Sequence, residues 1–193
     1  MDTVLAVLIG LGLSAACGFR IFVPLLVLSI ASAAGALDLA EDFQWLSSMP
    51  AIVALSVATV LEVLAYFIPG VDHALDVLAA PVSVVAGTVA VASVVTDMSP
   101  FLRWMLAIIA GGGTAGLVQG LTSTTRVVSA VKTAGFGNPV VAGAEAGGAI
   151  VLSVMSIAAP IAAAVIAVLL AVFAFRAGRT IFRRFRRSHA GGA

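Results

Sequence analysis

Long apolar runs fill almost the whole chain and leave too few charged residues to cover a water-exposed surface. Hydrophobic residues make up 62% of the 193 residues, charged residues only 10%, and the mean hydropathy is +1.20. A soluble domain of this size carries about 25% charged residues. The surface of this chain must therefore face lipid, and the sequence predicts an all-α, polytopic integral membrane protein.

The apolar stretches are separated by proline, glycine and polar residues into six segments. A crossing needs about 20 apolar residues. The first segment is longer than that and is interrupted at Gly18 and Pro24, so we expect it to be tilted, kinked or broken. Pro160 divides the last stretch, 139–176, into two helices. The expected crossings are 4–34, 50–68, 72–95, 101–131, 139–157 and 161–175, in a single transmembrane domain over residues 1–175.

The charges predict an orientation for this domain. Six of the ten basic residues lie in the tail 176–193, whereas three acidic residues cluster in the loop 35–49. Basic segments remain on the cytoplasmic side of a membrane. Six crossings then place both termini in the cytoplasm of a multi-pass inner-membrane protein. The tail adjoins a membrane helix, so we expect it to bind anionic lipid and not nucleic acid.

Two parts of the chain, 106 residues apart, share a pattern of small residues followed by arginine. The first ends at Arg20 and the second at Arg126. The pattern predicts two inverted three-helix repeats, 1–96 and 101–175, an arrangement common in transporters and often built with broken helices. Chance similarity in a chain rich in glycine and alanine is the alternative. The small residues that align are Gly10, Ser14 and Gly18 with Gly116, Gly120 and Thr124.

Several ionisable residues lie inside the apolar segments, where their burial is costly and suggests function by default. Arg20 needs a buried carboxylate partner, for which we expect Glu62, with two aspartates as substitutes. Arg126 and Glu145 form the expected counterpart pair. Such pairs either line a pathway for a substrate or ion, or clamp the helices structurally. The candidate pathway residues are Arg20, Glu62, Asp72, Asp76, Arg126, Asn138 and Glu145.

Asp72, His73 and Asp76 follow a Pro-Gly break, at the expected start of a helix. Carboxylates at a helix start cap free N–H groups and favour the positive end of the helix dipole. That role alone explains Asp72. Two carboxylates and a histidine are also a weak candidate for a divalent cation site. The sequence has no second ligand cluster with defined spacing, so no metal or other cofactor is expected.

Three segments together resemble the signatures of a bacterial membrane-protein family, domain of unknown function 4126. They are Gly18-Phe19-Arg20-Ile21-Phe22-Val23-Pro24-Leu25-Leu26, Glu62 followed by Ile68-Pro69-Gly70-Val71-Asp72, and Arg126 followed by Gly137-Asn138-Pro139 and Glu145. The resemblance covers most of residues 5–160. It implies a membrane location and a multi-helix fold, but no established activity. The family often has aspartate after the last glutamate, whereas Ala146 stands here, which argues against a role for two adjacent acids.

The chain contains no Gly-x-Ser-x-Gly, His-Glu-x-x-His or P-loop motif, so we do not expect an enzyme.

Cys17 is the sole cysteine, which rules out an internal disulfide. The segment around Cys17 is interpreted as a retained helix and not as a lipoprotein signal. Gly112, Gly116 and Gly120 form a ridge of small residues on the expected helix 101–131. Ridges of this kind more often pack against another helix of the same chain than form the interface of a homodimer, and both roles are open here.

Two hypotheses for the function follow. The first is a transporter or channel-like carrier of a small solute or ion. The second is a non-transporting structural or lipid-handling membrane protein. A continuous polar groove along the buried charges would favour the first hypothesis, and charges sealed in pairs without a cavity would favour the second.

Overall fold

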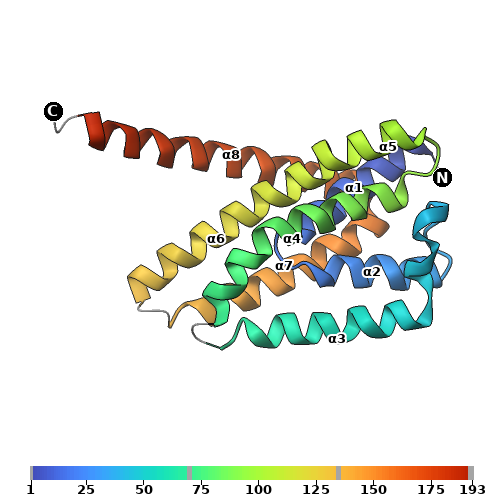
Figure 1. Cartoon of the computed structure of the whole chain (residues 1–193), viewed down its shortest axis with the longest axis horizontal. Helices are drawn as coiled ribbons and strands as arrows, with labels where there is room; N and C mark the ends of the chain where they lie inside the picture. The colour runs from blue at the N-terminus through green and yellow to red at the C-terminus, as the bar shows by residue number, and fades with distance from the viewer. Residues whose placement is uncertain (1, 69–70, 134–135, 191–193) are drawn as a thin grey trace.

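In the computed structural model, helical segments account for most of residues 2–68, 71–133 and 136–190, which are the residues described (Figure 1). Of residues 71–73 and 181–190 only the backbone is described. No strand occurs in these ranges, so the predicted all-α fold is confirmed. The elements are α1 (Thr3–Cys17), α2 (Phe22–Ala33), the 3₁₀ helix η1 (Glu41–Ser47), α3 (Met49–Ala65), α4 (Val71–Val94), α5 (Pro100–Leu106), the π-helix η2 (Ala107–Gly112), α6 (Gly113–Thr133), α7 (Asn138–Ala158) and α8 (Pro160–Ala190).

Four helical stretches are long and apolar enough to cross a membrane: Ala74–Val94, Pro100–Thr133, Asn138–Ala158 and Pro160–Thr180. A fifth crossing results if η1 and α3, which meet at a bend of 67°, are counted together. The chain is therefore a multi-pass membrane protein. The expected count of six crossings is not confirmed, because the first apolar segment forms two helices of only 15 and 12 residues.

These two short helices run in opposite directions and form a hairpin (Figure 1). α1 begins at the right of Figure 1 and ends in the middle of the bundle, and α2 returns to the right. There the Ser29 hydroxyl of α2 donates a hydrogen bond to the Leu46 carbonyl of η1. The hairpin enters and leaves the bundle at the same end, so it does not cross from one end to the other.

The hairpin affects two further expectations. α1 begins and α8 ends at opposite ends of the molecule (Figure 1), so the placement of both termini on one side is not confirmed. The inverted repeat is not confirmed either. Arg20 lies in a break between helices, whereas its counterpart Arg126 lies inside α6, which continues α5 and η2 in one run of 34 residues.

The hairpin helix α1 lies in the centre of the bundle, with Leu13, Ala16 and Cys17 fully buried. It packs against α4, α6, α7 and α8. Small residues bring these helices close together. A Cβ atom placed on Gly111 would lie 2.5 Å from the Gly87 carbonyl oxygen of α4, and the Ser14 hydroxyl donates to the Gly111 carbonyl.

The predicted glycine ridge packs internally over part of its length. A Cβ on Gly112 would lie 2.8 Å from the Thr88 hydroxyl, and one on Gly116 would lie 3.0 Å from Val84. Nothing lies within 4 Å of the corresponding position on Gly120. Internal packing therefore accounts for Gly112 and Gly116 but not for Gly120. The possible homodimer is not tested by these contacts and stays a prediction.

Gly111→Ala tests the close contact between η2 and α4. The added methyl group would push against backbone atoms of α4, which cannot move aside as a flexible side chain can, and we expect a loss of about 1–3 kcal/mol in stability. Gly113→Ala is the matched control, because nothing lies within 4 Å of its added Cβ. Thermal unfolding in detergent should show a lower Tm for the first variant only. Equal Tm values for the two would contradict the packing described.

Candidate functional site

The turn between α1 and α2 places Arg20 inside the bundle. A Cβ on Gly18, just before it, would lie 2.5 Å from the Val118 Cβ of α6, so the turn is pressed against that helix. Arg20 is only 1% exposed. Its Nη2 atom donates to the Ala142 carbonyl of α7 at 2.9 Å and lies 3.6 Å from the Glu145 carboxylate.

Glu145 joins Arg20 to a second buried arginine. Arg126 of α6 binds both oxygens of Glu145, with Nε donating to Oε1 at 3.1 Å and Nη2 donating to Oε2. The remaining nitrogen, Nη1, donates to Oδ1 of Asp76 in α4 at 2.8 Å. One carboxylate therefore holds two guanidinium groups, and the bonds tie α4, α6 and α7 to the hairpin turn.

These contacts settle the predicted pairing. The expected pair of Arg126 with Glu145 is confirmed, and so is the expectation that Arg20 meets a buried carboxylate. The choice of Glu62 as that carboxylate is wrong. Glu62 binds the backbone of the hairpin turn, which leaves Glu145 as the carboxylate within ion-pair distance of Arg20 among the described side chains.

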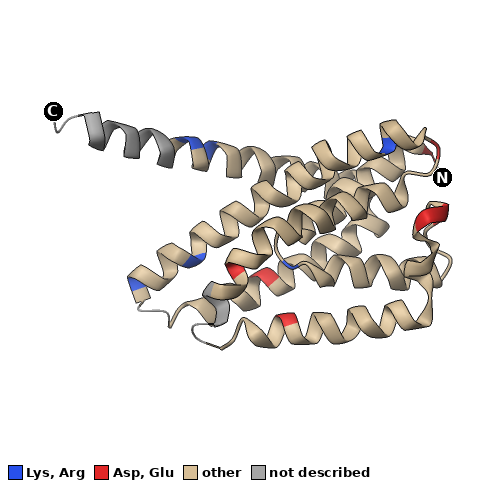
Figure 2. Cartoon of the chain, in the orientation of Figure 1, with Lys and Arg blue, Asp and Glu red and all other residues tan. Residues whose placement is uncertain are grey.

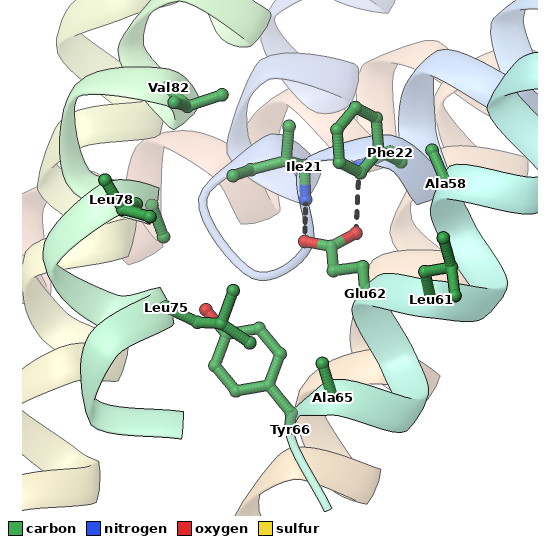
Figure 3. A pocket seen from close by; sticks show the side chains of 11 residues that line it. Ile21, Phe22, Ala58, Leu61, Glu62, Ala65, Tyr66, Leu75, Leu78 and Val82 are labelled. Atoms are coloured by element: carbon green, nitrogen blue, oxygen red, sulfur yellow. Dashed lines mark hydrogen bonds between the residues drawn. The ribbon is translucent and has the colours of Figure 1, made fainter. Parts of the chain in front are cut away.

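Glu62 of α3 caps the start of α2. Its two carboxylate oxygens accept hydrogen bonds from the backbone N–H groups of Ile21 at 2.7 Å and Phe22 at 3.0 Å (Figure 3). A helix start leaves backbone N–H groups without hydrogen-bond partners, and inside a membrane no bulk water is available to accept from them. α2 has no side-chain cap of its own. Glu62 supplies the cap, and its negative charge favours the positive end of the helix dipole.

Tyr66, the residue that follows α3, contacts both arginines. Its ring lies 4.0 Å from the Arg20 guanidinium carbon and 3.9 Å from that of Arg126, measured to the ring centroid. The ring thus makes a cation–π contact with each arginine. Sequence reasoning missed this residue. The available signal was that the sole tyrosine of the chain lies one helical turn after Glu62, an ionisable residue inside an apolar segment.

The other predicted residues are only partly described. Asp76 joins the cluster through Arg126, and Asn138 is buried at the start of α7. Asp72 and His73 lie outside the residues whose side chains are described. Among the side chains that are described, no group of three histidine, cysteine or acidic residues could hold a metal ion.

Two grooves reach this buried cluster, which comprises Arg20, Glu62, Tyr66, Asp76, Arg126 and Glu145. One groove of about 400 Å³ lies between α3 and α4, with Glu62 and Tyr66 among otherwise apolar side chains (Figure 3). The other, of about 360 Å³, lies between α6 and α7 and is lined by Glu145. The charges are paired, which is the arrangement expected of a structural clamp. Two cavities nevertheless reach them, which is the arrangement expected of a pathway for a substrate or ion.

Comparison with known proteins identifies the family. The family described as Domain of unknown function (DUF4126) matches residues 7–180. The chain belongs to this family. The match includes every residue of the buried cluster, and the resemblance found in the three signature segments is thereby confirmed. Neither the curated proteins nor the solved structures include a match to this chain.

Arg20→Ala tests whether the cluster stabilises the fold. Removing one partner of a buried ion pair costs about 3–5 kcal/mol, because the other charge stays buried. Lys132→Ala is the control: Lys132 is exposed in the last turn of α6, so we expect its loss to change the stability by less than about 1 kcal/mol. Denaturant unfolding of purified protein measures both. An Arg20→Ala protein as stable as the wild type would contradict the burial of the pair.

Proposed function

We propose that this protein is a carrier of a small solute or ion and that the buried cluster is its binding centre. The observation that carries the proposal is the α1–α2 hairpin, which ends inside the bundle and brings a helix start and Arg20 to buried carboxylates. Many transporters bind their substrates at discontinuous helices of this kind. Irregular backbone at membrane depth is tolerated where protein buries it or where it lines a cavity.

The pairing within the cluster supports a carrier more than a fixed clamp. Glu145 is shared between two arginines, so it can strengthen one bond while weakening the other. Arg20 keeps two buried nitrogens, Nε and Nη1, without a hydrogen-bond partner. A purely structural pair would gain stability by satisfying these donors, because unsatisfied buried polar atoms are costly.

The helices around the cluster also have features that allow movement. η2 is a π-helical segment, a form often found at functional sites. On α7, nothing lies within 4 Å of a Cβ built on Gly143, Gly147 or Gly148, so these glycines near Glu145 are not required by tight packing. Glycines of this kind loosen a membrane helix next to a binding site.

A lipid-handling protein is the second candidate, and the α3–α4 groove favours it. The groove opens between Leu61 and Leu78, whose side chains are 61% and 62% exposed and face the bilayer. Apart from Glu62 and Tyr66 its lining is apolar. A groove of this kind accepts hydrocarbon chains from the membrane, and lipid transfer without solute transport would be the activity expected of it.

We further propose that five crossings place the start of α1 outside the cell membrane and the end of α8 in the cytoplasm. Figure 2 shows acidic residues, together with Arg103 of α5 paired to Asp42, at the end of the molecule where α1 begins, and basic residues at the opposite end. Asp2, Glu41 and Asp42 belong to the acidic end, and Lys132 and Arg179 to the basic end. The excess of basic residues on the cytoplasmic side gives this orientation.

Cysteine labelling tests the orientation. Cys17 is buried, so the unmodified chain provides a silent background. Thr3→Cys and Asp42→Cys should react with a membrane-impermeant thiol reagent added outside cells, and Lys132→Cys should react only after the membrane is opened. Thr3→Cys is the decisive variant, because six full crossings would place it on the same side as Lys132→Cys. Labelling of Thr3→Cys only in opened membranes would refute the hairpin topology.

Transport assays in liposomes test the carrier. Glu62→Gln and Glu145→Gln keep the side-chain size but remove the charge, and we expect each to lower flux at least tenfold while the protein remains folded. Glu41→Gln, at the exposed acidic end, is the control and should retain flux. Protons, alkali cations and small anions would be screened, with Tm measured on the same samples. Absence of flux for every solute in the wild type, with lower Tm in the cluster variants, would favour the structural hypothesis.

A further inference from the structure

We infer that the substrate of this carrier is a small monocarboxylate with an apolar tail, moved together with a proton, and that Glu145 occupies the place of its carboxylate in the structure. This inference rests on the proposed function, because it names the substrate class of the same site. It is drawn from the bonds of Glu145, from the free donors of Arg20 and from the groove between α6 and α7.

Glu145 is bound as a substrate carboxylate would be. Two guanidinium groups from different parts of the chain converge on it, one at 3.6 Å and the other through two hydrogen bonds. Arginine forks match carboxylate geometry and are widely used to recognise it. An arginine pair that holds a resident carboxylate can hold an incoming one in the same way, provided that the resident group gives up its charge.

Arg20 has bonding capacity that the resident carboxylate leaves unused. Its side chain is fully buried, yet Nε and Nη1 have no hydrogen-bond partner. One face of the guanidinium lies against Tyr66, which leaves its edge for acceptors. A mobile carboxylate is not tied to the α7 backbone as Glu145 is. It can therefore approach Arg20 more closely than 3.6 Å and accept from Nε and Nη2 together, as Glu145 does from the same two atoms of Arg126.

The groove between α6 and α7 leads to this position and defines the rest of the ligand. Glu145 lines the groove whereas neither arginine does, so Glu145 is the member of this ion-pair group that borders the cavity. The other lining residues are mostly apolar, with two threonine hydroxyls, and Val140 at the rim is 76% exposed. They are Phe19, Leu121, Thr122, Thr125, Val140, Val141 and Ala144. This lining fits an apolar tail and not a second charge.

Charge balance links the anion to a proton. The described charged side chains facing the site are Arg20, Arg126, Asp76, Glu62 and Glu145, and Tyr66 contacts both arginines. If Glu145 takes up a proton as the substrate carboxylate binds, the total charge of the cluster does not change. Binding the anion without the proton would bury an additional negative charge, which is strongly unfavourable in a membrane. The proton comes from the medium and returns to it when the anion leaves.

Calorimetric titration of the purified full-length protein with benzoate tests the inference. Benzoate is a monocarboxylate with an apolar ring, and benzylamine has the same shape with the opposite charge. Both are titrated at about pH 6 and about pH 8, where benzoate, like other carboxylic acids, stays ionised. We expect benzoate to bind more tightly at the lower pH, by up to about tenfold per pH unit for one linked proton. Benzylamine should not bind.

Glu145→Gln should bind benzoate at least tenfold more tightly than the wild type at the higher pH, with no pH dependence, and should lose proton-driven uptake in liposomes. A structural role for Glu145 would not produce tighter binding. Glu41→Gln, exposed in η1 outside the cluster and the groove, is the control and should retain both the affinity for benzoate and its pH dependence.

A second pair of variants covers the case in which Glu145→Gln fails to fold. Ala144→Phe fills the groove and should weaken benzoate binding about tenfold, whereas Ala162→Phe, exposed on α8 outside the groove, should not. If the wild type does not bind benzoate but still moves cations or protons across the liposome membrane, this inference is wrong and the carrier hypothesis is retained. If the wild type shows neither binding nor flux, the carrier hypothesis is wrong as well.

Discussion

The burial of the Arg20 guanidinium is the constraint on which the rest of this structure depends. A charge in the middle of an apolar bundle is stable only with a carboxylate and hydrogen-bond acceptors around it. Glu145 and the Ala142 carbonyl of α7 supply them. Arg20 can reach α7 because the chain breaks between α1 and α2, and that break exposes the start of α2. Glu62 of α3 then satisfies the exposed N–H groups.

The hairpin also determines how the remaining helices pack. Because α1 enters the bundle and ends at its centre, α4, α6, α7 and α8 must surround it without leaving gaps. Glycines and serines at the contacts allow this close approach, as at Gly87, Gly111 and Ser14. In lipid, helices associate through such close contacts, since no hydrophobic driving force acts between them. Gly18 has the same role next to Arg20, since it lets the hairpin turn lie against Val118 of α6.

The bounds of three helices could be predicted well from the sequence because proline, glycine and polar residues mark them, whereas the last helix, expected over 161–175, continues as α8 to Ala190. Helices expected at 50–68, 72–95 and 139–157 are observed as α3, α4 and α7 with ends shifted by three residues or fewer. The first segment could not be resolved, since a predominantly apolar stretch of 31 residues, 4–34, fits a kinked crossing or a hairpin equally well. The pair Arg126–Glu145 was predictable because each is a lone charge in an apolar run. The role of Glu62 was not, because its partners are backbone N–H groups, which leave no mark in a sequence.

α3 packs mainly against α2 and η1, and Ala51 is its one buried residue. Yet it carries Glu62, which caps the hairpin, and it is followed by Tyr66, which contacts both arginines. A helix with little apolar packing therefore holds two of the groups that stabilise the buried charges. Any displacement of α3 would remove the cap of α2 and the contacts of the Tyr66 ring with Arg20 and Arg126 together. The strength of the charge cluster is thus coupled to the position of a helix at the edge of the bundle.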